Sequence, residues 1–172
     1  MRFSVLLAGL AVVSAPVAAE REVRPLAEAT LMDAGGSRVG TARILPRSTG
    51  VVLEVEARGM SPGPHGMHLH AVGQCNGADF ANAGGHLNPD GHEHGVNNPK
   101  GSHLGDLPNV TASPEGWIKA SIRTDMRPFK LIQEIFDGDG TALVIHEGAD
   151  DYRTDPSGNS GKRVVCGVFE RP

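Results

Sequence analysis

Short stretches of alternating apolar and polar residues, separated by turn-forming residues, recur along this chain. From Val51 to Ala57 the odd-numbered residues are all apolar, while Glu54 and Glu56 fall on the other face. This alternation is typical of an antiparallel strand with one buried face. Comparable stretches, bounded by Gly, Pro, Asn and Asp, predict further strands at residues 27–32, 39–45, 65–72, 117–122, 132–136, 141–146 and 163–170.

The spacing of these stretches indicates the fold class. No segment shows a sustained helical period and turn signals recur at short intervals, so we predict an all-β sandwich or flattened barrel whose first three strands form a meander. The sequence Asp-Gly-Asp-Gly at 137–140 predicts a tight hairpin turn before the strand at 141–146. A calcium-binding EF-hand is not favoured there, because the further oxygen ligands and the distal glutamate that it needs do not follow.

Two segments, 73–108 and 147–162, follow neither a helical nor a strand period. Both are rich in Gly, Pro, Asn and Asp, which favour turns. A connection longer than about fifteen residues is usually functional or disordered, and the histidines of the first segment favour a functional loop. Because that loop has too little apolar material for a core of its own, a bound ion would be a main source of its order.

The candidate chemistry lies between residues 63 and 106. This stretch contains seven of the chain's eight histidines and ends in a carboxylate: His65, His68, His70, His86, His92, His94, His103 and Asp106. Imidazoles at this density suit zinc or copper. His68 and His70 are two residues apart, so on a strand both point to one face and can reach one ion. The pattern therefore predicts a two-metal site with ligands from one strand and one loop.

Three histidines carry a plainer interpretation, because an isolated histidine is more often a hydrogen-bonded structural residue than a ligand. His65 lies at an odd spacing from the pair on the strand, and we expect it to be structural. We expect His92 to be a solvent-exposed loop residue. His146 ends an apolar strand far from the cluster in sequence, so its own pattern predicts a core histidine.

Residues 1–19 have the pattern of a secretory signal peptide. Arg2 precedes an apolar run at 5–13, and small residues end the segment. The run is too short to span a bilayer, and no nearby cysteine offers a lipid attachment site. We therefore expect a mature, soluble, single domain at 20–172 in an oxidising compartment outside the cytoplasm.

Charge limits the possible binding partners, and the cysteine count limits how the two thiols can be used. The whole chain has 16 basic and 20 acidic residues, and loss of Arg2 with the signal peptide leaves 15 − 20 = −5. This balance does not favour nucleic acid as a partner. Cys75 and Cys166 form an even count in an exported chain, which favours one disulfide closing a long loop. Two free thiols serving as metal ligands are the alternative.

Five segments of this sequence together resemble the copper/zinc superoxide dismutases, and the exported, short-loop form resembles their bacterial periplasmic branch. The segments are Gly-Met-His-Leu-His at 66–70, Gly-His-Leu-Asn-Pro at 85–89, His-Leu-Gly-Asp-Leu at 103–107, Ile-His-Glu-Gly-Ala-Asp-Asp at 145–151 and Gly-Asn-Ser-Gly-Lys-Arg-Val-Val-Cys-Gly at 158–167. Each is a weak signal alone, but in this order they cover nearly all of the mature chain. Met67 departs from the pattern, because an aromatic residue is usual at that place.

The resemblance implies a Greek-key β-sandwich like the immunoglobulin fold, with one copper and one zinc ion per chain. It implies copper on His68, His70, His86 and His146, and zinc on His86, His94, His103 and Asp106, so that His86 bridges the two metals. It also implies that Asp150 links the outer nitrogens of one copper and one zinc histidine. Cys75 and Cys166 match the disulfide within the subunit.

The implied function is dismutation of superoxide to oxygen and hydrogen peroxide in the periplasm, which would protect the cell envelope. Arg163 would attract the anion, and His86 would take up and return a proton. A copper buffer or copper-delivery domain on the same fold would be expected to lack a copper ligand, the bridge or the arginine, and none is missing. A secreted zinc hydrolase is not favoured, because no glutamate base stands at zincin spacing. The sequence leaves open whether the chain is a monomer or a homodimer.

Overall fold

The computed structural model describes residues 23–124 and 126–172. The expected signal peptide at 1–19 lies outside these residues, as does the expected start of the mature chain at Glu20. Seven strands form one antiparallel sheet in the order β5-β8-β9-β1-β2-β3-β7. Their bounds are β1 Ala27–Asp33, β2 Arg38–Pro46, β3 Val51–Arg58, β5 Met67–His70, β7 Trp117–Thr124, β8 Ala142–His146 and β9 Arg163–Glu170.

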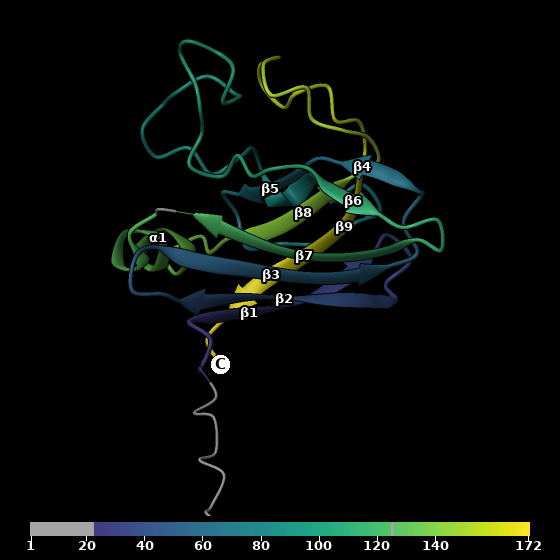
Figure 1. Cartoon of the computed structure of the whole chain (residues 1–172), viewed down its shortest axis with the longest axis horizontal. Coiled ribbons are helices and arrows are strands. Elements are labelled where there is room, and N and C mark those ends of the chain that lie inside the picture. The colour runs from purple at the N-terminus through teal and green to yellow at the C-terminus, as the bar shows by residue number, and fades with distance from the viewer. Residues whose placement is uncertain (1–22, 125) are drawn as a thin grey trace, which may run out of the picture.

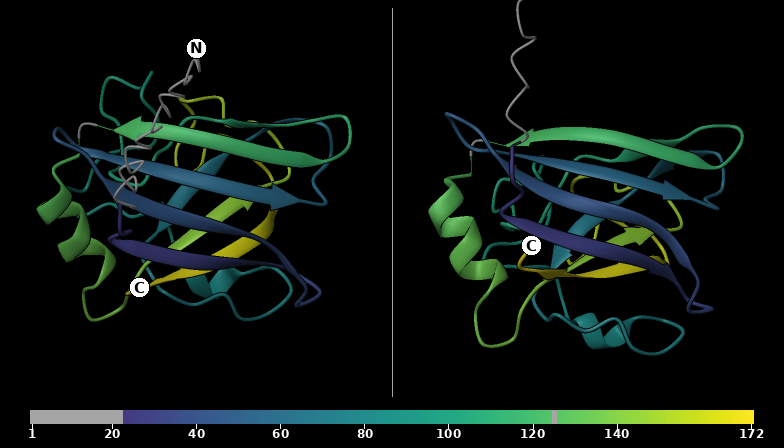
Figure 2. Two further views of the ribbon diagram at one scale, coloured as in Figure 1. Left: turned by 60° about the horizontal axis from the view of Figure 1, so that its bottom comes forward. Right: turned by 90° about the horizontal axis from the view of Figure 1, so that it is seen from below.

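The sheet curls until its two ends face each other across the core (Figures 1 and 2). Leu53 of β3 and Ile118 of β7 belong to the same buried cluster as Leu69 of β5, Leu143 of β8 and Phe169 of β9. Consecutive pairing of β1, β2 and β3 gives the expected meander. The prediction of an all-β, sandwich-like barrel is therefore confirmed.

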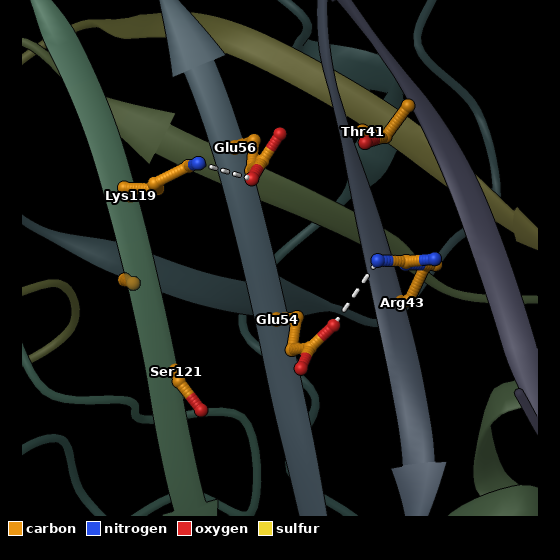
Figure 3. Close-up of a pocket in the computed structure, with 7 residues that line it drawn as sticks. Thr41, Arg43, Glu54, Glu56, Lys119 and Ser121 are labelled. Carbon is orange, nitrogen blue, oxygen red and sulfur yellow. Dashed lines mark hydrogen bonds and ion pairs between the residues drawn. The ribbon is translucent and has the colours of Figure 1, made fainter. Parts of the chain in front are cut away.

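The outer face of β2, β3 and β7 is polar, as the alternation in β3 predicts. Figure 3 shows Glu54 and Glu56 of β3 directed toward cations on the neighbouring strands. Arg43 Nη2 lies 3.2 Å from Glu54 Oε2, and Lys119 Nζ lies 3.2 Å from Glu56 Oε1. Both pairs join residues directly opposite each other in the strand register. Exposed pairs of this kind contribute about 1 kcal/mol or less each, so burial of the inner face dominates the stability of the sheet.

The expected strand at 132–136 is wrong, because residues 132–135 belong to helix α1, Pro128–Ile135, and Phe136 caps its end. Leu131 and Ile135, one helical turn apart, are the buried residues of α1, and proline is well tolerated in the first turn. A short apolar run does not distinguish a strand from one buried helix face. The hairpin predicted at 137–140 is consequently wrong too. The turn joins α1 to β8, and Asp137 Oδ1 accepts hydrogen bonds from the backbone N–H groups of Asp139 and Gly140.

The histidine strand expected at 65–72 is divided at Gly66. β4 (Gly63–His65) pairs with β6 (Val110–Ala112) in a second, two-stranded sheet, whereas β5 pairs with β8. Gly66 lies against the loop at 147–162, and a Cβ atom there would be 2.8 Å from Ser160 Cβ. Its N–H donates to Gly148 O at 2.7 Å, and its carbonyl accepts from His146 N at 2.8 Å. Gly66 thus lets the end of β8 and the second loop approach the start of β5.

Both long loops lie on the same side of the sheet, above β5 and β8 (Figure 1). The first loop, 73–108, has as its helix or strand elements only the short 3₁₀ helix η1, Ala81–Ala83. It is fastened to β5 by backbone hydrogen bonds from Leu69 N to Gly105 O at 2.9 Å and from Leu87 N to Leu69 O at 2.8 Å. The fold therefore brings the histidines of the strand and of the loop to one end of the sheet.

Candidate metal centre

Four histidines from three parts of the chain form the first cluster. His68 and His70 lie on β5, His86 on the first loop and His146 at the end of β8, and one ring nitrogen from each lies within 4.8 Å of the others. Pairing of β5 with β8 brings His146 to the strand-borne pair. All four residues are buried.

In the described part of the chain, each histidine of this first cluster has one ring nitrogen without a hydrogen-bond partner and one that is hydrogen-bonded. Among the described residues, the buried side-chain N and O atoms without a hydrogen-bond partner are His68 Nδ1, His70 Nε2, His86 Nε2 and His146 Nε2. The other ring nitrogen of each histidine is held. His70 Nδ1 lies 3.0 Å from Gly84 O and His146 Nδ1 lies 3.1 Å from Gly161 O. Because an unpaired buried polar atom is costly, four of them directed together fit a bound cation.

A second cluster surrounds Asp106. The Nδ1 atoms of His86 and His94 each lie 3.0 Å from Asp106 Oδ1, and that of His103 lies 3.2 Å from the same oxygen. One group with ligand atoms within 4.8 Å of one another consists of His68, His86, His94 and Asp106 and does not include His103, although His103 Nδ1 lies only 3.4 Å from His86 Nδ1. His103 is nevertheless placed at the shared carboxylate oxygen, whereas His68 directs one nitrogen to a different carboxylate. We therefore favour His103 as the fourth member.

His86 belongs to both clusters. Its Nδ1 faces Asp106, and its Nε2 is one of the unpaired nitrogens of the first cluster. One imidazole therefore separates the two clusters and presents a nitrogen to each, as a bridging ligand must.

Asp150 joins the clusters a second time through the outer nitrogens. Its Oδ2 lies 2.8 Å from His68 Nε2 and its Oδ1 lies 3.0 Å from His94 Nε2, with all three side chains fully buried. Asn109 holds this carboxylate in place, because its amide donates to Asp150 O and accepts from Asp150 N, both at 2.9 Å. Tyr152 N also donates to Asp150 Oδ1, at 2.6 Å.

The protonation equilibria favour metal binding at the first cluster. Burial lowers the pKa of His70 to about 2, that of His146 to about 3 and that of His86 to about 4. A neutral imidazole keeps the lone pair that a metal needs.

The second cluster behaves differently in the metal-free protein. Burial opposes protonation of His94, but hydrogen bonds to Asp106 and Asp150 outweigh it and raise the pKa of His94 to about 9. Burial acts to raise the pKa of both carboxyl groups, but hydrogen bonds from the histidines prevail and hold the pKa of each well below its usual range. A metal ion at this cluster would therefore displace the His94 proton and meet two ionised carboxylates.

Arg163, the first residue of β9, reaches the first cluster from the side. A cavity of about 360 Å³ is lined by His70, His86, His146 and Arg163 among others. The guanidinium is fixed from behind, because Nη1 donates to Phe80 O and Nη2 donates to Gly84 O, each at 2.7 Å.

A disulfide joins Cys75 to Cys166, with their Cα atoms 5.6 Å apart, so the expectation of a bridge is confirmed. It ties the start of the first loop to β9 three residues after Arg163. The alternative of two thiol ligands is thereby excluded.

Comparison with known proteins identifies the family. The family whose sequence profile matches residues 39–169 is described as copper/zinc superoxide dismutase. The chain belongs to this family. A relative from Aquifex aeolicus, "Superoxide dismutase [Cu-Zn] 2", is 38% identical over 149 residues, which cover 83% of this chain and 85% of the relative.

Solved structures agree with this assignment. A "SOD-like protein" from Bacillus subtilis has a TM-score of 0.76 at 40% identity, covering 82% of this chain and 96% of that one. The Cu/Zn superoxide dismutase from Brucella abortus has a TM-score of 0.68 at 28% identity, covering 83% of this chain and 98% of that one. The resemblance inferred from the five motifs is confirmed, and with it the expectation of a copper- and zinc-dependent dismutase.

Two histidines of the cluster region lie outside both groups. His65 is fully buried, with Nδ1 2.7 Å from His146 O and Nε2 2.7 Å from Ser61 O. It therefore supports the strand end that carries His146. His92 is exposed, and its Nδ1 lies 2.9 Å from Ser102 O. Both agree with their plainer interpretation.

Sequence reasoning missed the residues that act through backbone groups. No pattern in the sequence assigns Asn109 to the metal centre, and none identifies the backbone carbonyls of Phe80 and Gly84 as hydrogen-bond acceptors. The two hydrogen bonds between Asn109 and Asp150 join residues 41 positions apart, so no local sequence pattern predicts them.

Proposed function

We propose that this chain removes superoxide in the bacterial cell envelope as a periplasmic enzyme, with copper in the first cluster and zinc in the second. Copper supplies one-electron redox chemistry, and zinc supplies a fixed positive charge that orders the ligands. One superoxide anion gives up an electron and becomes oxygen. A second accepts that electron with two protons and becomes hydrogen peroxide.

The observation that carries the copper assignment is the set of four unpaired, buried nitrogens. His68 would bind through Nδ1, and His70, His86 and His146 through Nε2. The chemistry of this set, four imidazole nitrogens without a thiolate, fits copper. Zinc would be held by His86, His94, His103 and Asp106, a set of three imidazole nitrogens and one carboxylate oxygen that zinc commonly takes in four-coordinate sites.

His86 would serve in proton transfer at its Nε2. The atom is buried and has no protein partner among the described residues, and His86 lines the cavity that also contains Arg163. Whenever this nitrogen is not coordinated, it can hold a proton between the two half-reactions and release it to the reduced substrate. The Nδ1 atom would stay in the zinc set beside Asp106, so the ring would keep its orientation while Nε2 changes state.

Arg163 would bind and orient the substrate. Its guanidinium lines the cavity beside His70 and His146, and two backbone carbonyls fix its position. Because the chain carries a net negative charge, attraction of an anion must come from such local positive charge.

Export completes the proposal. The pattern of residues 1–19 supports a signal peptide, and the disulfide fits an oxidising compartment. In the described residues, no helix combines the length and apolar character needed to cross a membrane.

Replacement of Arg163 tests the function directly. After loading with both metals, Arg163→Ile should keep its metal content but remove superoxide at least about tenfold more slowly. A tenfold loss of rate corresponds to about 1.4 kcal/mol of lost transition-state stabilisation. Arg123→Ile, which removes an equal charge from an exposed position on β7, is the matched control and should keep the wild-type rate. Metal analysis and direct observation of superoxide decay after pulse radiolysis give the answer. A fully loaded wild type with no turnover would instead indicate a copper-binding or copper-delivery protein.

A further inference from the structure

Two cavities meet at Arg163. The inner cavity, described above, contacts His70, His86 and His146. An outer cavity of about 540 Å³ is lined by Asp79, Lys162 and Arg163, together with small residues of both loops. Gly85, Gly161 and Arg163 line both. An anion approaching through the outer cavity therefore passes the charged side chains of Asp79 and Lys162 before it reaches the inner one.

Asp79 is the only carboxylate among the described residues that line these two cavities. It is placed by the same segment that holds Arg163, because the next residue, Phe80, accepts a hydrogen bond from the guanidinium. Asp79 Oδ1 accepts from Ala81 N at 3.1 Å, which orients the carboxylate at the start of η1. The negative charge of Asp79 acts on Arg163, since it opposes the lowering of the Arg163 pKa by burial.

A carboxylate at the entrance of a site for an anion reduces attraction, so its presence needs a physical reason. The Coulomb energy is proportional to the charge of the incoming ion. If one carboxylate reduces the local concentration of a univalent anion by some factor, it reduces that of a divalent anion by the square of that factor. The carboxylate therefore costs superoxide little and excludes divalent anions more strongly.

We propose that Asp79 is a charge-selective filter at the entrance, which discriminates superoxide from divalent oxyanions such as sulfate. Without it, Lys162 and Arg163 would give the outer cavity two uncompensated positive charges, which attract a divalent anion more than a univalent one. With it, the net charge of these three groups is +1. The inference rests on the proposed function and adds a specificity-determining residue to it.

Three variants separate the charge of Asp79 from its structural role. Asp79→Asn removes the charge and keeps the oxygen that accepts from Ala81 N. Asp79→Glu keeps the charge on a longer side chain. Glu28→Gln is the matched control, because Glu28 is exposed on β1 opposite Glu170, at the other end of β9 from Arg163. Seven residues of strand separate those ends by about 23 Å.

The readout is anion binding to the copper-loaded protein, independent of turnover. Azide, a univalent probe, is titrated through its absorption with copper, and sulfate is titrated as its competitor. Both are measured at a constant ionic strength of about 0.01 M, where the Debye length of about 30 Å leaves charges within about 10 Å of each other only weakly screened. If the anion binds about 6 to 9 Å from the carboxylate, a unit charge in a water-like medium changes the affinity for a univalent ion about two- to threefold and that for a divalent ion about four- to ninefold.

Asp79→Asn should therefore strengthen sulfate binding by about the square of the change seen with azide, and raise the superoxide rate by about the azide factor. Asp79→Glu should keep the wild-type ratio of sulfate to azide affinity, and Glu28→Gln should do so too. An unchanged ratio in Asp79→Asn, or an equal change in Glu28→Gln, overturns the proposal. Failure of the wild type to remove superoxide would overturn the proposed function instead, and the two affinities would still decide the role of Asp79.

Discussion

Replacement of Asp150 by asparagine should weaken copper binding without any change at a copper-facing nitrogen. In the wild type, Asp150 accepts from His68 Nε2 at 2.8 Å and from His94 Nε2 at 3.0 Å, with one oxygen for each. The Tyr152 N–H donates to Oδ1, so an asparagine must keep its oxygen on that side and turn its NH₂ group toward His68. That NH₂ group can only donate. His68 Nε2 would then have to accept, and the ring proton would move to Nδ1.

The expected magnitude follows from this change of tautomer. His68 Nδ1 is the nitrogen that faces the first cluster, and a proton there blocks coordination. Loss of an outer partner of a ligating histidine commonly costs about 10- to 100-fold in metal affinity, or about 1.4 to 2.7 kcal/mol. Zinc should lose less than copper, because Oδ1 still accepts from His94.

Competition with a chelator of known affinity, followed by metal analysis, measures both effects. Asp151→Asn is the control, because Asp151 is the exposed neighbour and its carboxylate holds only the turn formed with Thr154 and Asn159. It removes the same charge and loosens the same loop without touching a histidine. Wild-type copper affinity in Asp150→Asn would refute the tautomer argument, and equal losses in both variants would assign the effect to loop order.

Two further predictions concern stability. Cys166→Ser removes a disulfide that joins residues 91 positions apart, which the chain-entropy model values at about 4 to 5 kcal/mol. Calorimetry should therefore show a melting temperature lower by roughly 10 to 15 °C. An unchanged melting temperature would contradict this prediction. In the metal-free protein, the pKa values of His70, His86 and His146 lie at about 2 to 4, whereas the unfolded chain has a histidine pKa of about 6.5. As the pH falls, the unfolded chain therefore takes up protons before the folded protein does. Stability should therefore fall below pH 6.5 by up to about 1.4 kcal/mol per pH unit for each of the three imidazoles. His94 has the opposite sign, since its contribution is complete below pH 6.5 and is lost as the pH rises through about 9. Urea midpoints that stay constant from neutral pH to pH 5 would contradict the first of these trends.

The sequence predicted most of the strands because each has a local pattern. The odd-numbered residues of β3 are apolar and buried as expected, but Val52 on the other face is buried too, so the alternation is complete only from Leu53 onward. Helix α1 was missed because its eight residues give the helical period too little length to show. Whether such a run becomes a helix or a strand depends on what it packs against, and that is decided by residues far away in sequence.

The candidate site was predictable to different degrees for the same reason. The same-face geometry of His68 and His70 follows from strand geometry alone. His146 came only from the family resemblance, because the pairing of β5 with β8 joins segments about 75 residues apart, and no local period carries that information. Asp79 has no local sequence signal either, since its effect depends on a cavity formed by two loops.

The carbonyl of Gly84 serves two partners at once, His70 Nδ1 at 3.0 Å and Arg163 Nη2 at 2.7 Å. A displacement of this peptide group would therefore carry the proposed copper ligand and the proposed substrate-binding cation in the same direction, so their separation should fluctuate less than the position of either. Insertions between Cys75 and Asp79 would lengthen the loop before this segment and leave His70 and Arg163 in the same relative position. Insertions between Phe80 and Gly84 would separate the two carbonyl groups that accept hydrogen bonds from Arg163. Variation in loop length that preserves activity should therefore concentrate in the first of these intervals.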